Sequence, residues 1–230
     1  MPKLKAQLHV HCKGDPIDNI KLTARQVIDH AARLNYDVLA ITCHNVIIFT
    51  QELKEYAHSR RILLIPGIEK SIEKKHVLIL NAHIDAQKMD NFTDLEKYRL
   101  AHPESLIIAV HPYFPSLNSL GKKFDRHHRL FDAVEYSWFH SKKINYFNKK
   151  AQKSADKYKL PLVSTSDNHL IKYFDYAYSF IDSEKDTGKI FTAIRENRLH
   201  IISHDLKWWQ LPMIYIKMGI LELVKKVTLK

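Results

Sequence analysis

Short apolar, β-branched runs alternate along the chain with segments in which apolar residues recur every three to four positions. The run at 6–12 is followed by a helical pattern over 23–35, and the run at 37–45 is followed by a second helical pattern over 50–59. Short apolar runs predict strands, whereas a repeat of three to four residues predicts an amphipathic helix. The N-terminal part is therefore expected to be built from strand–helix units.

The same alternation continues through the rest of the sequence. Further strands are expected at 61–69, 76–84, 106–112, 131–138, 160–169 and 176–182, and further helices at 93–101, 144–159 and 187–197. Near-continuous apolar strands alternating with amphipathic helices predict an α/β fold with a mainly parallel sheet covered by helices. The pattern fits either a barrel or a doubly wound sheet.

Two of the expected helices begin with a capping signal. Thr23 is followed by Gln26, and Thr93 by Glu96, which is the spacing of a capping box.

The length of 230 residues is compatible with one large domain or two small ones. No repeat, low-complexity tract or Gly/Ser linker appears before about residue 203, so we expect one domain over 1–204. Residues 205–230 are expected to form an amphipathic helical tail. The tail segment 208–228 fits packing on its own domain, a homo-oligomer contact or a membrane-surface helix.

Composition adds a bias in charge and little evidence for export. The net charge of +11 favours anionic partners such as nucleotides, nucleic acid or an acidic membrane, although a basic solvated surface explains it equally well. Two cysteines are too few for a disulfide scaffold. The N-terminus lacks the long apolar core of a signal peptide, so we expect a reduced, cytoplasmic protein.

Histidines and carboxylates stand at the ends of the expected strands. They are His9, His11, His44, Glu69, His111, Asp167 and His169. The carboxyl ends of parallel strands share one face in barrels and open α/β sheets. We therefore expect these side chains to converge at that face.

A single histidine at a strand end is more often a surface or hydrogen-bonded residue than a metal ligand. Seven imidazole and carboxylate groups, each at the end of an expected strand, are not expected to occur together by chance. Such donors suit Zn, Mn or Fe, and the chain has no thiolate set for a structural zinc site.

Six short motifs give the sequence a family resemblance. In chain order they are LHVHCKGD, ITCHN, PGIE, HVLIL, AVHP and STSDNH. On these motifs the chain resembles the polymerase-and-histidinol-phosphatase (PHP) domain over residues 5–204. The resemblance implies a distorted (β/α)7 TIM-like barrel, here with a C-terminal helical extension, that hydrolyses phosphoesters.

The resemblance also implies a site with two or three divalent metal ions (Zn, Mn or Fe). The implied ligands are His9, His11, Asp15, His44, Glu69, His76, His111, Asp167 and His169. His83 competes with His76, which we prefer because it opens the strand after the Glu69 motif. Glu69 is the best candidate to bridge two ions, and His111 or a bound water is the candidate to protonate the leaving group.

One position departs from the family pattern. Cys43 stands where the family usually carries Asp beside the second-strand histidine. By alternation along a strand its side chain should point away from that of His44, as Cys12 does from His11. We interpret both thiols as buried packing residues rather than ligands.

The substrate is expected to be a phosphorylated small molecule or nucleotide. The basic segment 121–129 follows the His111 motif, and its Lys122, Lys123 and Arg126 are candidates to bind phosphate. A charged run is also the usual composition of a solvated loop. A metal-dependent nuclease and a degenerate PHP domain that acts as a binding module are the alternative functions.

Overall fold

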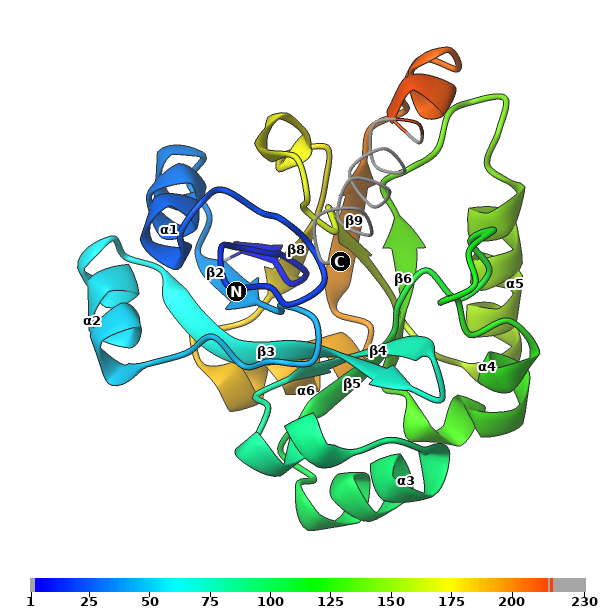
Figure 1. Cartoon of the computed structure of the whole chain (residues 1–230), viewed down its shortest axis with the longest axis horizontal. Helices are drawn as coiled ribbons and strands as arrows, with labels where there is room; N and C mark the ends of the chain where they lie inside the picture. The colour runs from blue at the N-terminus through cyan, green and yellow to red at the C-terminus, as the bar shows by residue number, and fades with distance from the viewer. Residues whose placement is uncertain (1–2, 215, 217–230) are drawn as a thin grey trace, which may run out of the picture.

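Nine strands form one strongly curved sheet in the computed structural model, which describes residues 3–214 and 216 (Figure 1). The strands are β1 (Lys3–Gln7), β2 (Val38–Ile41), β3 (Leu63–Ile72), β4 (Lys75–Leu80), β5 (Leu106–Ala109), β6 (Ala133–Ser137), β7 (Leu162–Thr165), β8 (Ala177–Asp182) and β9 (Leu199–Ser203). Their order in the sheet is β7-β6-β5-β4-β3-β2-β1-β8-β9.

The two flanks of this sheet meet, so that it nearly closes into a barrel. Ser164 of β7 and Ser179 of β8 exchange hydrogen bonds, in which the Ser164 backbone N–H donates to Ser179 Oγ at 2.9 Å. Beyond the end of β7, Asn168 pairs with Val10 in an isolated parallel bridge. The expected barrel-type α/β fold is therefore confirmed.

Helices cover the outside of the barrel. They are α1 (Ala24–Arg33), α2 (Gln51–Ser59), α3 (Phe92–Ala101), α4 (Lys122–His127), α5 (Tyr146–Tyr158) and α6 (Thr187–Arg195), with short 3-10 helices η1 (Ile84–Lys88), η2 (His128–Leu130) and η3 (Ile171–Tyr173). Figure 1 shows α1 and α2 on one side of the molecule and α5 on the other.

The expectation of a mainly parallel sheet is wrong. Pairs β1–β2, β2–β3, β5–β6 and β6–β7 are parallel, whereas β3–β4, β4–β5, β1–β8 and β8–β9 are antiparallel. Only Glu73 and Lys74 separate β3 from β4, and both have positive φ, as a two-residue hairpin turn of type I′ requires. A parallel crossover needs a dozen or more residues, so β4 must run back along β3. A count of seven β/α units is not confirmed.

Local capping explains where two helices begin. The expected capping box of Thr23 and Gln26 is present at the start of α1. The box expected at Thr93 is wrong, because α3 already begins at Phe92 and Asn91 accepts a hydrogen bond from the Asp94 backbone N–H. Asn is among the strongest N-cap residues, and it lies two positions earlier than Thr93.

Besides the short 3-10 helices, one α-helix and one strand were not expected from the sequence. The basic segment expected as a loop contains α4, which buries a single aromatic side chain, Phe124, among charged neighbours. One buried position gives too little periodicity to predict a helix. The edge strand β9 is only half buried, so its apolar signal is weak.

The barrel interior is apolar at the end where α6 packs. Side chains such as Leu4, Val38 and Ile65 from the strands contact Ile190 and Phe191 of α6 in one buried cluster. Because β8 runs antiparallel to β1, α6 follows β8 at the end of the barrel where β1 begins. The opposite end, beyond the carboxyl ends of β1 and β2, is left for polar side chains.

The start of the expected tail packs on the barrel. Residues 210–214 are helical, and Leu211 and Ile214 lie in a buried cluster with Trp138, Tyr173 and Leu206. Most of the proposed contact segment 208–228 lies outside the described residues, so the domain boundary at 204 and the oligomer or membrane contact remain predictions.

No helix among residues 3–214 and 216 is long and apolar enough to cross a membrane.

Gly67 brings β3 against β2, and we predict that this contact tolerates no larger side chain. A Cβ at Gly67 would lie 2.6 Å from Thr42 Cγ2 and 3.2 Å from the Ile41 carbonyl oxygen. Gly67→Ala should therefore lower the free energy of unfolding by about 1–3 kcal/mol in urea titrations.

The matched control for this change is Gly188→Ala at the start of α6. There the nearest atom, Asp186 Oδ1, lies at an ordinary 3.4 Å, so the change should stay within about 0.5 kcal/mol. Equal effects of the two substitutions would contradict the importance of the close approach at Gly67.

Candidate metal centre

The expected site residues lie mostly just beyond the strands rather than within them. β1 ends at Gln7, so His9 and His11 occupy the extension that pairs with Asn168. His44 follows β2 and forms an isolated bridge with Glu69, which itself lies inside the long strand β3. All nine residues expected as ligands are nevertheless brought together at this end of the barrel.

Glu69 lies at the centre of the site with its two oxygens facing different imidazoles. Oε2 lies 3.3 Å from His9 Nε2, 3.4 Å from His11 Nε2 and 3.0 Å from His44 Nε2. Oε1 lies 2.8 Å from His76 Nδ1 and 3.4 Å from His111 Nε2. The carboxylate therefore joins two sets of nitrogen donors, as a bridging ligand must.

Asp167 supplies a second carboxylate to the first of these sets. Its Oδ1 lies 3.4 Å from His9 Nε2 and 3.3 Å from His11 Nε2. Asp167 has φ of 40° and His111 has φ of 29°, which are unfavourable for residues other than glycine. Strained backbone of this kind clusters at functional sites, where surrounding contacts maintain it.

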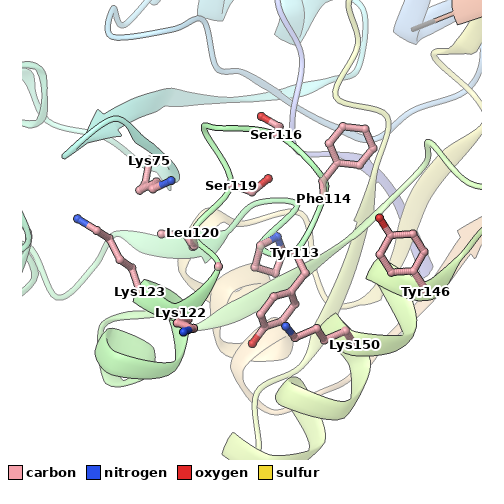
Figure 2. Close-up of a pocket in the computed structure, with 12 residues that line it drawn as sticks. Lys75, Tyr113, Phe114, Ser116, Ser119, Leu120, Lys122, Lys123, Tyr146 and Lys150 are labelled. Atoms are coloured by element: carbon pink, nitrogen blue, oxygen red, sulfur yellow. The ribbon is translucent and has the colours of Figure 1, made fainter. Parts of the chain in front are cut away.

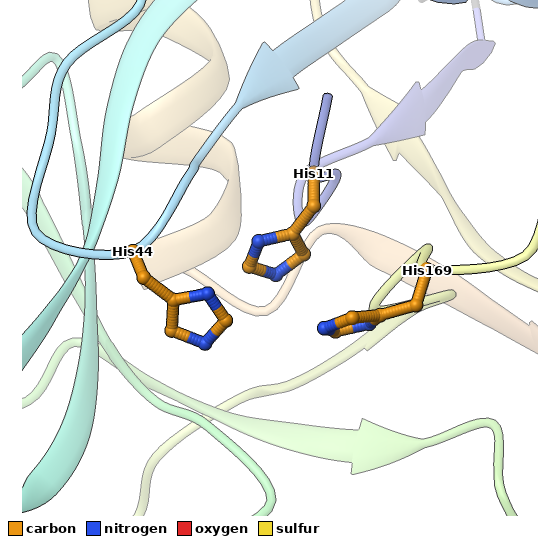
Figure 3. A group of neighbouring side chains, drawn as sticks. All are labelled: His11, His44 and His169. Carbon is orange, nitrogen blue, oxygen red and sulfur yellow. The ribbon is translucent and has the colours of Figure 1, made fainter. Parts of the chain in front are cut away.

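A third group of donors lies beside His11 and His44. His11, His44 and His169 offer nitrogen atoms within 4.8 Å of one another, and Figure 3 shows the three rings converging from separate segments. Asp15 contacts His11 Nδ1 at 2.8 Å and His44 Nδ1 at 3.0 Å, and its carboxylate also accepts the His44 backbone N–H.

Two residues of the site were missed by sequence reasoning, although one of them, Glu135, stands out in the sequence as an acid within an apolar run. Glu135 lies in the apolar strand β6, where a buried acid is unusual, and its Oε1 lies 2.9 Å from His9 Nδ1. Its Oε2 accepts the His111 backbone N–H at 2.7 Å. A carboxylate on Nδ1 orients the ring and leaves Nε2 available, as partners of metal-bound histidines do.

Asp18 is the other missed residue. Its Oδ2 lies 3.0 Å from His169 Nε2 and 3.4 Å from His44 Nδ1. It stands in the loop between β1 and α1, where no periodic pattern distinguishes it from an exposed acid.

Opposite charges and burial determine the protonation of the centre. Burial by itself lowers the pKa of His9, but Asp167, Glu69 and Glu135 outweigh it and raise that pKa to about 10. Burial also lowers the pKa of His44, but Glu69 and Asp15 outweigh it and raise that pKa to about 9.

The carboxylates shift in the opposite direction. Burial favours the protonated form of Glu69, yet His76, His44 and His9 hold its pKa well below the usual value. Burial at Asp167 is similarly outweighed by His9 and His169, so its pKa is also lowered. Both carboxylates are therefore ionised at neutral pH.

Several buried polar atoms here lack a hydrogen-bond partner among the described residues. They are both carboxylate oxygens of Glu69, Oδ1 of Asp167 and Nδ1 of His111. Unsatisfied buried polar groups are costly, and so many in one place indicate a group that the chain alone does not supply. Imidazole nitrogens with carboxylate oxygens fit divalent ions such as Zn, Mn or Fe.

Cys43 lies beside this centre but faces another thiol. Its Sγ lies 3.7 Å from Cys12 Sγ and accepts the Cys12 backbone N–H at 3.3 Å. The contact with Cys12, together with burial, raises the pKa of the Cys43 thiol. Both cysteines are fully buried in an apolar cluster with α1. Cys43 Sγ also lies within 4.8 Å of a donor atom of His11 and of Asp15, so its packing role remains a prediction.

The candidate substrate residues divide into two groups. Lys122 and Lys123 line a cavity of about 450 Å³, whereas Arg126 is not among its lining residues (Figure 2). The cavity also contains Lys75 and Pro112, which adjoin His76 and His111 in the sequence.

No family model matches the sequence. No curated protein shows significant sequence similarity to it.

Solved structures share the fold at low sequence identity. A two-domain protein from Bacteroides vulgatus that contains a predicted PHP-like metal-dependent phosphoesterase has a TM-score of 0.70 and 16% identity, over 94% of this chain and 70% of that protein. The lesion-specific endonuclease EndoQ from Pyrococcus furiosus has a TM-score of 0.61 and 14% identity, over 87% of this chain and 58% of that enzyme.

A complex of Endonuclease Q with a 27-mer duplex carrying an abasic lesion at its active site has a TM-score of 0.59 and 13% identity, over 85% of this chain and 57% of that protein. These similarities confirm that the chain has the PHP-like fold expected from its motifs.

We predict that metal binding at this centre releases protons. With pKa values of about 10 and 9, His9 and His44 are protonated at pH 7 in the metal-free protein, whereas a metal ligand must be a neutral imidazole. The apparent metal affinity should therefore rise between pH 6 and about pH 9. Calorimetric titrations with Zn²⁺ or Mn²⁺ in buffers of different ionisation enthalpy measure the release, and binding without proton release at pH 7 would contradict this charge state.

Proposed function

We propose that the chain is a metal-dependent phosphoesterase whose multinuclear centre is organised by Glu69. The observation that supports this most directly is the division of the Glu69 oxygens between two sets of imidazoles. A carboxylate shared between two sets of neutral donors is typical of sites with adjacent divalent ions. The PHP-like fold agrees with this chemistry.

Three of the overlapping sets of donor atoms at this centre consist only of imidazoles and carboxylates other than Asp15. The first is His9, His11, Glu69 and Asp167, the second is His44, Glu69 and His76, and the third is His11, His44 and His169. His111 shares Glu69 Oε1 with His76, and Asp15 contacts His11 and His44. We assign two or three divalent ions (Zn, Mn or Fe) to these nine residues. The three sets share Glu69, His11 and His44, so they do not count as three independent sites.

Bound divalent ions would polarise a phosphoryl oxygen and lower the pKa of water, which is what phosphoester hydrolysis requires at neutral pH. The chain contributes the geometry. Glu69 fixes the two donor sets relative to each other, and Glu135 holds His9 in the orientation that directs Nε2 inward. His111 is the candidate proton donor to the leaving oxygen where its imidazole holds no ion, since Pro112, Tyr113 and Phe114, which follow it, line the neighbouring cavity. Where His111 serves as a ligand, a bound water would take this role.

That cavity favours a phosphorylated small molecule or nucleotide as substrate. Its volume of about 450 Å³ is within the range of small-molecule sites. Lys75, Lys122, Lys123 and Lys150 supply positive charge to its wall (Figure 2). Its aromatic residues Tyr113, Phe114 and Tyr146 offer apolar surface on which a base or other flat group could stack.

Part of this charge is already engaged. Lys123 pairs with Glu73, Lys75 donates to the Leu117 carbonyl oxygen at 2.6 Å, and Lys150 Nζ lies 4.3 Å from the Tyr113 ring centroid. A short anion therefore fits this wall better than a long phosphate backbone, which would need many uncommitted cations.

A metal-dependent nuclease is the second candidate. The net charge of +11 and the shared fold of an endonuclease favour it. A binding module without catalysis is the third, and it would retain metal without hydrolysing any ester.

The first functional prediction concerns the double substitution His9→Ala with His11→Ala. Removing two donors from the first set should abolish binding of at least one ion and reduce phosphoesterase activity more than about 100-fold. Elemental analysis and turnover of a phosphate-ester panel are the measurements, with circular dichroism as the control for folding. Full activity with unchanged metal content in this variant would overturn the proposed centre.

The second functional prediction separates the substrate classes. Lys122→Glu with Lys150→Glu should raise KM for a mononucleotide about fivefold per lysine, as expected for about 1 kcal/mol each. Arg126→Glu is the matched control, because Arg126 lies on α4 with Lys122 but does not line the cavity.

Salt dependence completes this comparison. Activity on a mononucleotide should vary weakly from about 50 to 200 mM salt, because one phosphoryl group makes few ionic contacts. Three results together would favour the nuclease. Activity on an oligonucleotide would fall steeply with salt, Arg126→Glu would remove this salt dependence as fully as the lysine substitutions do, and small monoesters would not be turned over.

A further inference from the structure

A second cluster of histidines and carboxylates lies at the other end of the barrel. His83 directly precedes η1, His102 follows α3, and Glu104 precedes β5. Strand β5 runs from this cluster towards His111, which belongs to the central site. The seven-residue separation between Glu104 and His111 spans roughly 20 Å of extended chain, so the two groups are distinct.

The donor atoms of this cluster converge. His83 Nε2 lies 2.7 Å from Glu104 Oε1, and His102 Nδ1 lies 3.5 Å from the same oxygen. One donor atom from each of the three residues lies within 4.8 Å of the others. The two imidazole rings are stacked with centroids 4.1 Å apart, so protonating both would place two like charges in contact.

A second carboxylate orients one of the ligands. Asp85 Oδ2 lies 2.8 Å from His102 Nε2, which places the proton of the neutral ring on Nε2 and directs the lone pair of Nδ1 towards Glu104. A carboxylate–histidine pair of this kind is the usual support for a metal-bound imidazole.

The backbone around the cluster is held by a buried tyrosine. Tyr98 OH accepts the His83 backbone N–H at 3.0 Å and contacts Ser105 Oγ at 3.3 Å. Ser105 Oγ in turn donates to the Asn81 carbonyl oxygen. The His102 backbone N–H donates to the Tyr98 carbonyl oxygen, so His83 and His102 are anchored to the same residue.

We propose that His83 Nε2, His102 Nδ1 and Glu104 Oε1 form a separate Zn²⁺ site, with Asp85 as a positioning residue. Two imidazoles and one carboxylate are a common set of three protein ligands for zinc, which takes a fourth ligand from solvent. His83 and Glu104 are about half exposed, so the ion can enter without opening the barrel. The site links the β4–η1 connection to the α3–β5 connection, and zinc there stabilises the segment 81–105 by binding only the folded arrangement.

The test counts zinc equivalents in the full chain by calorimetric titration and elemental analysis. The wild-type protein should bind one equivalent more than His83→Ala or His102→Ala. His58→Ala is the matched control, because His58 is an exposed helical histidine outside the cluster, and it should retain the full count. Equal zinc counts and affinities in wild type, His83→Ala and His102→Ala would overturn the proposal.

Two further variants separate ligation from a merely structural ion pair. Asp85→Asn should keep the equivalent but weaken its affinity about 10- to 100-fold. Glu104→Gln keeps the side-chain shape while removing the charge and should lose the equivalent. In hydrogen exchange, zinc should protect residues 81–105 in wild type and in His58→Ala but not in His102→Ala. Protection that is identical in all three proteins would show that zinc acts elsewhere.

The central site gives an independent control. None of the substituted residues touches it, so phosphate-ester turnover at saturating central metal should be unchanged in His83→Ala. A parallel loss of turnover and of the zinc equivalent would contradict the separation of the two sites.

Discussion

The buried charge of Glu69 is the constraint on which the rest of the site depends. A carboxylate that is only 1% exposed is unfavourable unless partners of opposite charge, hydrogen bonds or metal ions compensate for it. Five imidazoles surround this one, and in the metal-free protein those that hold a proton provide that compensation. Divalent ions can replace these protons without leaving the carboxylate unpaired. The same arrangement of side chains therefore suits both the metal-free and the metal-bound protein.

Holding Glu69 in place constrains the backbone over a wide region. Gly67, two residues earlier, lets β3 approach β2 closely, and the hairpin after Ile72 returns the chain so that His76 meets the second oxygen of Glu69. The first oxygen is met by His9 and His11 from the extension of β1. The antiparallel β3–β4 pair therefore has a functional consequence, because a helical crossover at that point would not place His76 beside Glu69.

Sequence patterns predicted the parts of the molecule that depend on local chemistry. The His9–His11 pair, Glu69 and the Asp167–His169 pair each follow or end an apolar run, so their position at one end of a barrel follows from strand polarity alone. The start of α1 was predicted because Thr23 and Gln26 make contacts only within that turn. The antiparallel course of β4 was missed because no glycine marks its turn, where Glu73 and Lys74 adopt positive φ instead.

Residues that act through other residues were harder to predict. Glu135 acts on His9 across more than a hundred residues of sequence, and only its unusual acidity in an apolar strand distinguished it. Asp18 and Asp85 had no such signal, because acids in loops and in short 3-10 helices are ordinary. Hydrogen bonds of this kind depend on which strands become neighbours, and that information lies in the closed sheet rather than in any short segment.

The two histidine–carboxylate clusters differ chiefly in burial, and burial determines what each can do. At the central site His9 and His11 are fully buried, several carboxylate oxygens lack hydrogen bonds, and opposing charges raise the pKa of His9 to about 10. Such a low-dielectric site makes each charge interaction strong, as the proposed hydrolysis of an anionic ester would require. The His83–His102–Glu104 cluster uses similar groups in contact with water, where charges are screened and each carboxylate already has a partner. An ion bound there would gain less from electrostatics and would act mainly by linking two chain segments. In the functions proposed above, the same donor chemistry would serve catalysis at one end of the barrel and stability at the other.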